Sequence, residues 1–239
     1  MPVRAKTQRR GSKRPRFLAP SHKWAGKVSY RTYDDPEKNE KVEGRITNII
    51  NDPGRTAPIM IVRYKDQKTL QCAPEGAYVG QKVQSGVQAE VREANILPLE
   101  KIPDGTRICN IELKPGDGGK MIRTAGSSAR ILSHEQDKVI IQLPSKKMKT
   151  LNPKCRAVIG KVAGAGFKEK PLLKAGKNYF ARRKRGKYWP IVAGTAMNAF
   201  EHPFGGGGRS GHKQKAVKRT ASRKLGSIAP KRTGRRKRK

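Results

Sequence analysis

Charge is distributed very unevenly along this chain of 239 residues. Residues 1–33 hold ten Lys and Arg and no Asp or Glu, whereas residues 34–137 hold fifteen basic and sixteen acidic residues. Residues 138–239 hold thirty basic residues and two acidic ones. Because like charges repel, a strongly basic segment does not fold compactly without a polyanion. We therefore expect a nearly neutral folded body between two basic extensions.

The composition restricts the class of partner. Hydrophobic residues make up 34% of the chain and aromatic residues 5%, so a core is expected only where the charges balance. The clustered Lys and Arg are typical of a protein that binds nucleic acid. The extensions lack the amphipathic helical stripe that a membrane-surface helix needs, and no apolar run is long enough to cross a bilayer. The N-terminus has no secretory signal, so we expect a soluble, cytoplasmic protein without a membrane partner.

The neutral body has the pattern of a mainly β protein. Residues 42–50, 57–64 and 69–73 read as short strands, separated by turn-forming sequences at 51–54 and 66–67. Strands so short and closely spaced are typical of a small antiparallel barrel or sandwich.

A second block, residues 88–162, predicts another small barrel, followed by a short helix near residues 171–180. Its candidate strands are 107–112, 121–124, 129–133, 139–143 and 155–160. The domain organisation that we predict is a basic extension over 1–33, a first barrel over 34–87, a second barrel over 88–170 and a basic extension over 171–239.

Metal, cofactor and disulfide motifs are absent from the sequence. Cys72, Cys109 and Cys155 are too few and too far apart for a disulfide framework, and we expect them to be buried thiols in a reducing compartment. They lack C-x-x-C spacing, and His202 and His212 are too far apart for a pair of helical ligands, so no metal site is expected. The glycines show neither P-loop nor dinucleotide-binding spacing, so no cofactor is expected.

The segment Arg182–Pro190 alternates basic and aromatic residues. Its guanidinium groups can reach phosphates while the rings of Tyr188 and Trp189 stack on unpaired bases. The alternative is that the rings anchor the segment on a barrel and the charges are only solvated. The thirty basic residues in this part of the chain favour nucleic-acid binding.

Four consecutive glycines, Gly205–Gly208, follow His202, Pro203 and Phe204. Backbone N–H groups without side chains can approach phosphates closely, although a flexible linker has the same composition. The flanking histidines, proline and phenylalanine favour a loop fitted to RNA. His202 beside Glu201 could act as a general base, but no Ser, Cys or Asp constellation accompanies it. We predict that the protein is not an enzyme.

The segment from Pro190 to Pro203, with the glycines after it, resembles the signature of the universal "L-two" family of the large ribosomal subunit. Supporting segments are 94–99, 102–106, 110–119, 123–126, 143–145 and 155–160, so the likeness covers essentially the whole chain. Phe204 stands where bacterial members have a second histidine, and Gly208-Arg209 follow. This loop, and an N-terminal extension shorter than that of bacterial members, both resemble archaeal or eukaryotic members.

The resemblance implies an oligonucleotide-binding-type barrel followed by an SH3-like barrel, with extensions threaded into large-subunit ribosomal RNA. It also implies neighbouring ribosomal proteins as partners, contact with the small subunit, and roles in subunit association, tRNA binding and the architecture near the peptidyl-transferase region. His202 matches a family histidine, which we assign to RNA contact and not to chemistry.

The candidate RNA-binding residues lie in the two extensions. They are Arg9, Arg10, Lys13, Arg14, Arg16, Arg182, Arg183, Lys184, Arg185, Trp189, Asn198, His202, Gly205, Gly206, Gly207, Gly208, Arg209, His212, Lys213, Arg219, Arg223, Lys224, Arg232 and Arg235. The alternatives are a chromatin-type protein that compacts DNA and an enzyme that uses His202.

Overall fold

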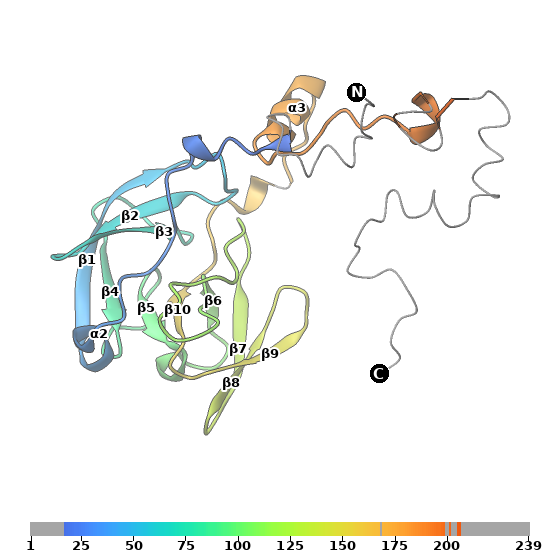
Figure 1. Ribbon diagram of the computed structural model, residues 1–239. Helices are drawn as coiled ribbons and strands as arrows, with labels where there is room; N and C mark the ends of the chain where they lie inside the picture. The colour runs from blue at the N-terminus through green and yellow to red at the C-terminus, as the bar shows by residue number, and fades with distance from the viewer. Residues whose placement is uncertain (1–16, 168, 199–200, 202–204, 207–239) are drawn as a thin grey trace, which may run out of the picture. The chain divides into compact units, whose positions relative to one another are not determined.

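The computed structural model describes residues 17–167, 169–198, 201, 205 and 206. By their contacts the residues divide into two units (Figure 1). The first, the sheet unit, is Ser21–Pro171, and the second, the extension unit, combines residues up to Pro20 with those from Leu172 onward.

The sheet unit contains ten strands in one continuous sheet. They are β1 (Lys41–Ile50), β2 (Ile59–Arg63), β3 (Lys68–Cys72), β4 (Lys82–Gly86), β5 (Ile96–Pro98), β6 (Arg107–Cys109), β7 (Ala129–Glu135), β8 (Lys138–Gln142), β9 (Met148–Leu151) and β10 (Arg156–Ile159). Their order across the sheet is β3-β2-β1-β4-β5-β10-β6-β7-β8-β9 (Figure 1). The short helices of this unit are η2 (Ser21–Lys23), α2 (Asp35–Asn39), η3 (Leu99–Lys101) and η4 (Ala165–Phe167).

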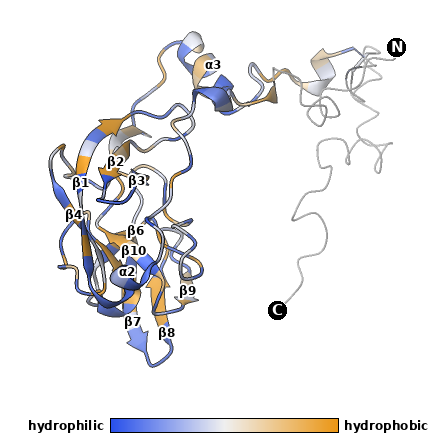
Figure 2. Cartoon of the chain, turned by 60° about the vertical axis from the view of Figure 1, so that its left-hand side comes forward, coloured by the Kyte–Doolittle hydropathy of each residue, from blue (hydrophilic) through white to orange (hydrophobic). Residues whose placement is uncertain are grey.

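The sheet has two halves, each with its own core. A single parallel pair, Ser85 with Ile96, joins β4 of the first half to β5 of the second, while all other strand pairings are antiparallel. The first half packs around Ile46, Met60 and Val62, and the second around a larger cluster that includes Ile108. The apolar stretches of the strands are drawn in orange in Figure 2. The prediction of a mainly β chain with an oligonucleotide-binding-type first part and a barrel-like second part is confirmed.

Six of the predicted strands are present, as β1, β2, β3, β7, β8 and β10. The strand predicted over 107–112 ends at Cys109, because Asn110 takes a φ of 49° and leaves the extended conformation. The strand predicted over 121–124 is wrong: Met121 forms one isolated bridge with Ile111, and Ile122 follows with a φ of 53°. Strands β4, β5 and β9 were not predicted.

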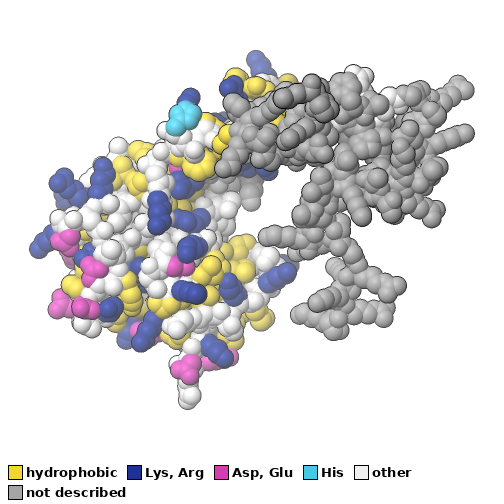
Figure 3. Space-filling view, in the orientation of Figure 1, with side chains coloured by type: hydrophobic (Ala, Val, Ile, Leu, Met, Phe, Trp, Pro, Cys, Tyr) yellow, Lys and Arg dark blue, Asp and Glu magenta, His cyan; other side chains and the backbone are white. Residues whose placement is uncertain are grey.

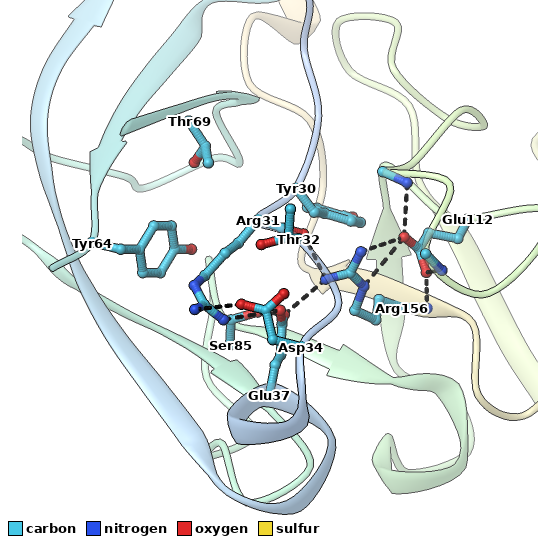
Figure 4. Close-up of polar contacts among 12 residues, drawn as sticks. Tyr30, Arg31, Thr32, Asp34, Glu37, Tyr64, Thr69, Ser85, Glu112 and Arg156 are labelled. Atoms are coloured by element: carbon cyan, nitrogen blue, oxygen red, sulfur yellow. Dashed lines mark hydrogen bonds and ion pairs between the residues drawn. The ribbon is translucent and has the colours of Figure 1, made fainter. Parts of the chain in front are cut away.

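A buried cluster of charges links α2, β10 and the segment after β6 (Figure 4). The Arg156 guanidinium donates to Glu37 Oε1 at 2.9 Å and to Glu112 Oε1 at 2.8 Å, and neither glutamate side chain is exposed. It also lies over the rings of Tyr30 and Tyr33, at 5.2 and 4.8 Å from their centroids. Burial would lower the pKa of Arg156, but the hydrogen bonds and charges of the two glutamates raise it above its ordinary value.

The three cysteines are free and buried, as predicted. Each thiol belongs to a different apolar cluster: Cys72 packs with Val28, Cys109 with Tyr30, and Cys155 lies in the core of the second half. Burial raises the pKa of all three thiols, that of Cys155 to about 11.

The described part of the extension unit holds two short helices, α3 (Ala175–Arg183) and η5 (Gly194–Ala196). The helix predicted near 171–180 is present as α3, although it begins and ends later than expected. Within the described residues, no helix has the length and apolar character needed to span a membrane.

Candidate nucleic-acid interface

Four consecutive cations, Arg182–Arg185, stand at the C-terminal end of α3. Arg183, Lys184 and Arg185 are exposed, and Arg182 is half-buried with its Nε donating to Asn178 Oδ1 at 3.1 Å. Cations at a helix C-terminus are favoured by the partial negative charge of the last carbonyls. The position therefore accommodates a dense group of positive charges that stays available to a polyanion.

Gly186 brings the two basic extensions into contact. The N–H groups of Gly186 and Lys187 donate to the carbonyls of Arg183 and Arg182, both at 3.0 Å, and Gly186 has a φ of +62°. This is the Schellman arrangement that closes a helix with glycine. A Cβ atom at Gly186 would lie 2.7 Å from the carbonyl oxygen of Phe17, so the N-terminal segment crosses directly over the helix end.

One aromatic ring of this segment packs within the extension unit. The rings of Tyr188 and Phe17 have centroids 5.9 Å apart, and Trp189 is half-buried. The ring of Tyr188 thus packs on the N-terminal segment, whereas the alternative proposed a barrel as its anchor.

The start of the glycine run folds back on the residues before it. The N–H of Gly206 donates to the carbonyl of Met197 at 3.0 Å, and the N–H of Glu201 donates to the carbonyl of Asn198, also at 3.0 Å. Gly205 is buried, and a Cβ atom there would clash with the carbonyls of Met197 and Asn198. Glycine at 205 is therefore required by the packing of the loop itself, whatever the loop contacts.

The remaining candidates lie outside the described residues. They are Arg9, Arg10, Lys13, Arg14, Arg16, His202, Gly207, Gly208, Arg209, His212, Lys213, Arg219, Arg223, Lys224, Arg232 and Arg235.

The sheet unit carries cations that the sequence prediction missed. Figure 3 shows Lys and Arg side chains spread across the visible face of this unit, with Asp and Glu gathered at fewer places. Strand register pairs Arg45 with both Arg63 and Lys82, and pairs Arg63 with Lys68. These four residues, here called the cation row, are all exposed. Each occupies an ordinary solvent-facing strand position, so the row emerges only once the register is known.

The part of the chain that the structure describes contains no cluster of three or more His, Cys, Asp or Glu able to hold a metal ion. The described residues instead present positive charge to a ligand, on the sheet unit and at the end of α3. Such a distribution suits a polyanion.

Comparison with known proteins gives a consistent result over nearly the full length. Residues 3–85 match the family model "Ribosomal Proteins L2, RNA binding N-terminal domain", and residues 92–225 match "Ribosomal Proteins L2, C-terminal domain". The chain is 47% identical over 240 residues to the large ribosomal subunit protein uL2 of Methanococcus aeolicus, covering 99% of this chain and 100% of the relative.

Two further archaeal relatives carry the same name. The protein of Methanothermobacter thermautotrophicus is 47% identical over 234 residues, with 96% of this chain and 97% of the relative covered. That of Methanopyrus kandleri is 45% identical over 239 residues, with 98% of each covered. The resemblance seen in the sequence is confirmed, and the chain belongs to the L2 family of ribosomal proteins.

Proposed function

We propose that this protein is a structural component of the large ribosomal subunit in the cytoplasm and binds the RNA of that subunit. The observation that carries the proposal is the similarity of nearly the whole chain to proteins named for the large ribosomal subunit, with a family model for RNA binding over residues 3–85. The segregation of charge supports it, because two basic extensions flank a body of balanced charge.

The physical basis of binding is charge neutralisation. Lys and Arg that contact phosphates release the counterions condensed on RNA, and this release drives association at moderate salt. Exposed cations such as Arg183, Lys184 and Arg185 supply such contacts, while Trp189 is assigned to stacking. Asn198, His202 and the glycine loop are assigned to close contacts with RNA.

Contacts with neighbouring ribosomal proteins and the small subunit, and support of tRNA binding and the peptidyl-transferase region, follow from the resemblance and stay predictions. The domain boundaries at 33/34, 87/88 and 170/171, which come from the charge and strand patterns, also stay predictions. His202 receives no chemical role, because no Ser, Cys or Asp constellation accompanies it in the sequence. A DNA-compacting protein would share the basic extensions but not the similarity to large-subunit proteins.

Co-sedimentation tests the proposal directly. The full-length, tagged protein is followed in a cell lysate before and after a high-salt wash, with parallel samples treated with DNase or RNase. We expect it to remain with the large subunit after the wash and after DNase, and to leave that fraction after RNase. Recovery as free protein, or loss on DNase treatment, would overturn the proposal.

A further inference from the structure

Four exposed cations lie side by side on four adjacent strands of the first half of the sheet. Reading across β3, β2, β1 and β4, the cation row consists of Lys68, Arg63, Arg45 and Lys82. Directly paired residues point to the same face, and strands lie about 4.8 Å apart, so the row spans about 14 Å. Their neighbours Ile46, Val62 and Val83 point into the core, so the four cations are on the outer face.

This arrangement is unfavourable for the protein alone. Like charges directly opposite each other on neighbouring strands are destabilising. All Asp and Glu of the chain lie among the described residues, and none of their carboxylates is within 4.0 Å of a cation of the row. Glu43 lies two residues before Arg45, on the same face of β1. Its carboxylate instead accepts a hydrogen bond from Gln84 at 3.4 Å. The row is thus left without an internal counter-charge.

A hollow adjoins one end of the row. It has a volume of about 470 Å³ and is lined by Thr47, Arg63, Tyr64, Lys65, Asp66, Gln67 and Lys68. Arg63 and Lys68 belong to both features, and Lys65 adds a further cation. The carboxylate of Asp66 is occupied by Arg31, at 3.0 Å. The hollow therefore offers space beside the positive charges of the row for a sugar or a base.

We propose that the cation row is a contact site for the sugar–phosphate backbone of folded ribosomal RNA. The proposal rests on the proposed function and adds to it a specific surface, which lies in the sheet unit and not in the extensions. A linear array of cations with no Asp or Glu carboxylate at ion-pair distance matches a repeating phosphate chain. The repulsion tolerated in the free protein is relieved when phosphates neutralise the four charges.

The experiment compares full-length variants for binding to large-subunit ribosomal RNA over a range of salt concentrations. The test variant combines Arg45→Gln with Arg63→Gln, and the matched control combines Lys101→Gln with Lys154→Gln, two exposed cations elsewhere in the same unit. Each phosphate contact contributes about 0.7–0.9 to the slope of log K against log salt. We expect the magnitude of this negative slope to fall by about 1.4–1.8 in the test variant. The control should leave the slope unchanged.

Thermal unfolding of the free proteins separates binding from folding. Because the substitutions remove repulsion between paired strands, the test variant should have a Tm equal to or above that of the wild type. Should it unfold earlier, the variant with Arg45→Lys and Arg63→Lys keeps the charges and must retain the wild-type slope.

Several outcomes would contradict the proposal in different ways. Wild-type binding with an unchanged slope in the test variant overturns the cation row but leaves the proposed function intact. An equal decrease in the matched control means that net charge, and not this row, governs binding. Equal wild-type affinity for duplex DNA, with the same loss in the test variant, overturns the assignment to folded RNA. No binding of the wild type to ribosomal RNA at any salt concentration overturns the proposed function itself.

Discussion

Arg156 shows what a single buried residue does for this fold. Its guanidinium hydrogen-bonds Glu37 and Glu112, and the backbone N–H groups of Gly118 and Arg156 also donate to Glu112, at 2.8 and 3.0 Å. Ser85 Oγ donates to Glu37 from the strand that ends the first half of the sheet. A buried charge without its partner is strongly destabilising, because no water replaces the lost interaction. Each member of this cluster therefore depends on the others.

We predict that Arg156→Met lowers the free energy of unfolding by about 3–5 kcal/mol, measured by urea denaturation. The substitution keeps most of the apolar stem but removes the guanidinium that both buried carboxylates share. Replacing Glu37 and Glu112 by Gln in the same chain should recover part of the loss. Arg92→Met is the matched control, because Arg92 is exposed and forms a surface ion pair with Glu90 at 2.9 Å. A loss in Arg156→Met no larger than in this control would contradict the interpretation.

The end of α3 is an element-scale feature that depends on one glycine. We predict that Gly186→Ala disrupts it, because the φ of +62° disfavours Ala and a Cβ atom would meet the backbone of Phe17 and Ala19 at 2.7 and 2.8 Å. In this variant, hydrogen exchange of the backbone amides at positions 186 and 187 should become at least about tenfold faster than in the wild type.

Gly176→Ala is the matched control, since a Cβ atom at that position of α3 would meet no heavy atom within 4 Å. Ala has a higher helix propensity than Gly, so exchange in α3 should not become faster. Faster exchange in both variants, or in neither, would show that Gly186 does not control the helix end.

The elements also show how far sequence reasoning reached. Strands with β-branched residues and clear turns between them, such as β1 to β3, were predictable from local pattern. The end of β6 at Cys109 was not, because the positive φ of Asn110 accompanies burial of this polar residue in the tertiary structure. Strands β4, β5 and β9 lack a strong β-branched pattern and depend on neighbours that are distant in sequence.

The candidate RNA-binding residues also fall into two groups, those that the sequence identified and those that only the structure identified. Local composition identified the cations after α3, because charge runs are visible in the sequence. The cation row depends on strand register, which single-sequence patterns do not determine. Gly186 and Gly205 are required by backbone contacts, so their role in packing could not be separated from a role in RNA contact before the structure was known.

For the whole molecule, the question is whether the two halves of the sheet unfold together. They are joined by one parallel strand pair, by the Arg156 cluster and by a shared apolar cluster that contains Tyr30, Ile96 and Cys109. Such links across a boundary favour a single cooperative transition. The three thiols report on this directly, because each lies in a different apolar cluster.

We predict that Cys72, Cys109 and Cys155 resist alkylation in the native protein at pH 8 and become reactive together at one urea concentration. Burial raises the pKa of each thiol, so the reactive thiolate is scarce until the core opens. Mass spectrometry after short alkylation pulses identifies which thiol has reacted. A Lys101→Cys variant supplies an exposed thiol as the control for reagent activity. Reaction of Cys155 at lower urea than Cys72 would show that the second half opens on its own, and the links between the halves would then be too weak to make the sheet unit cooperative.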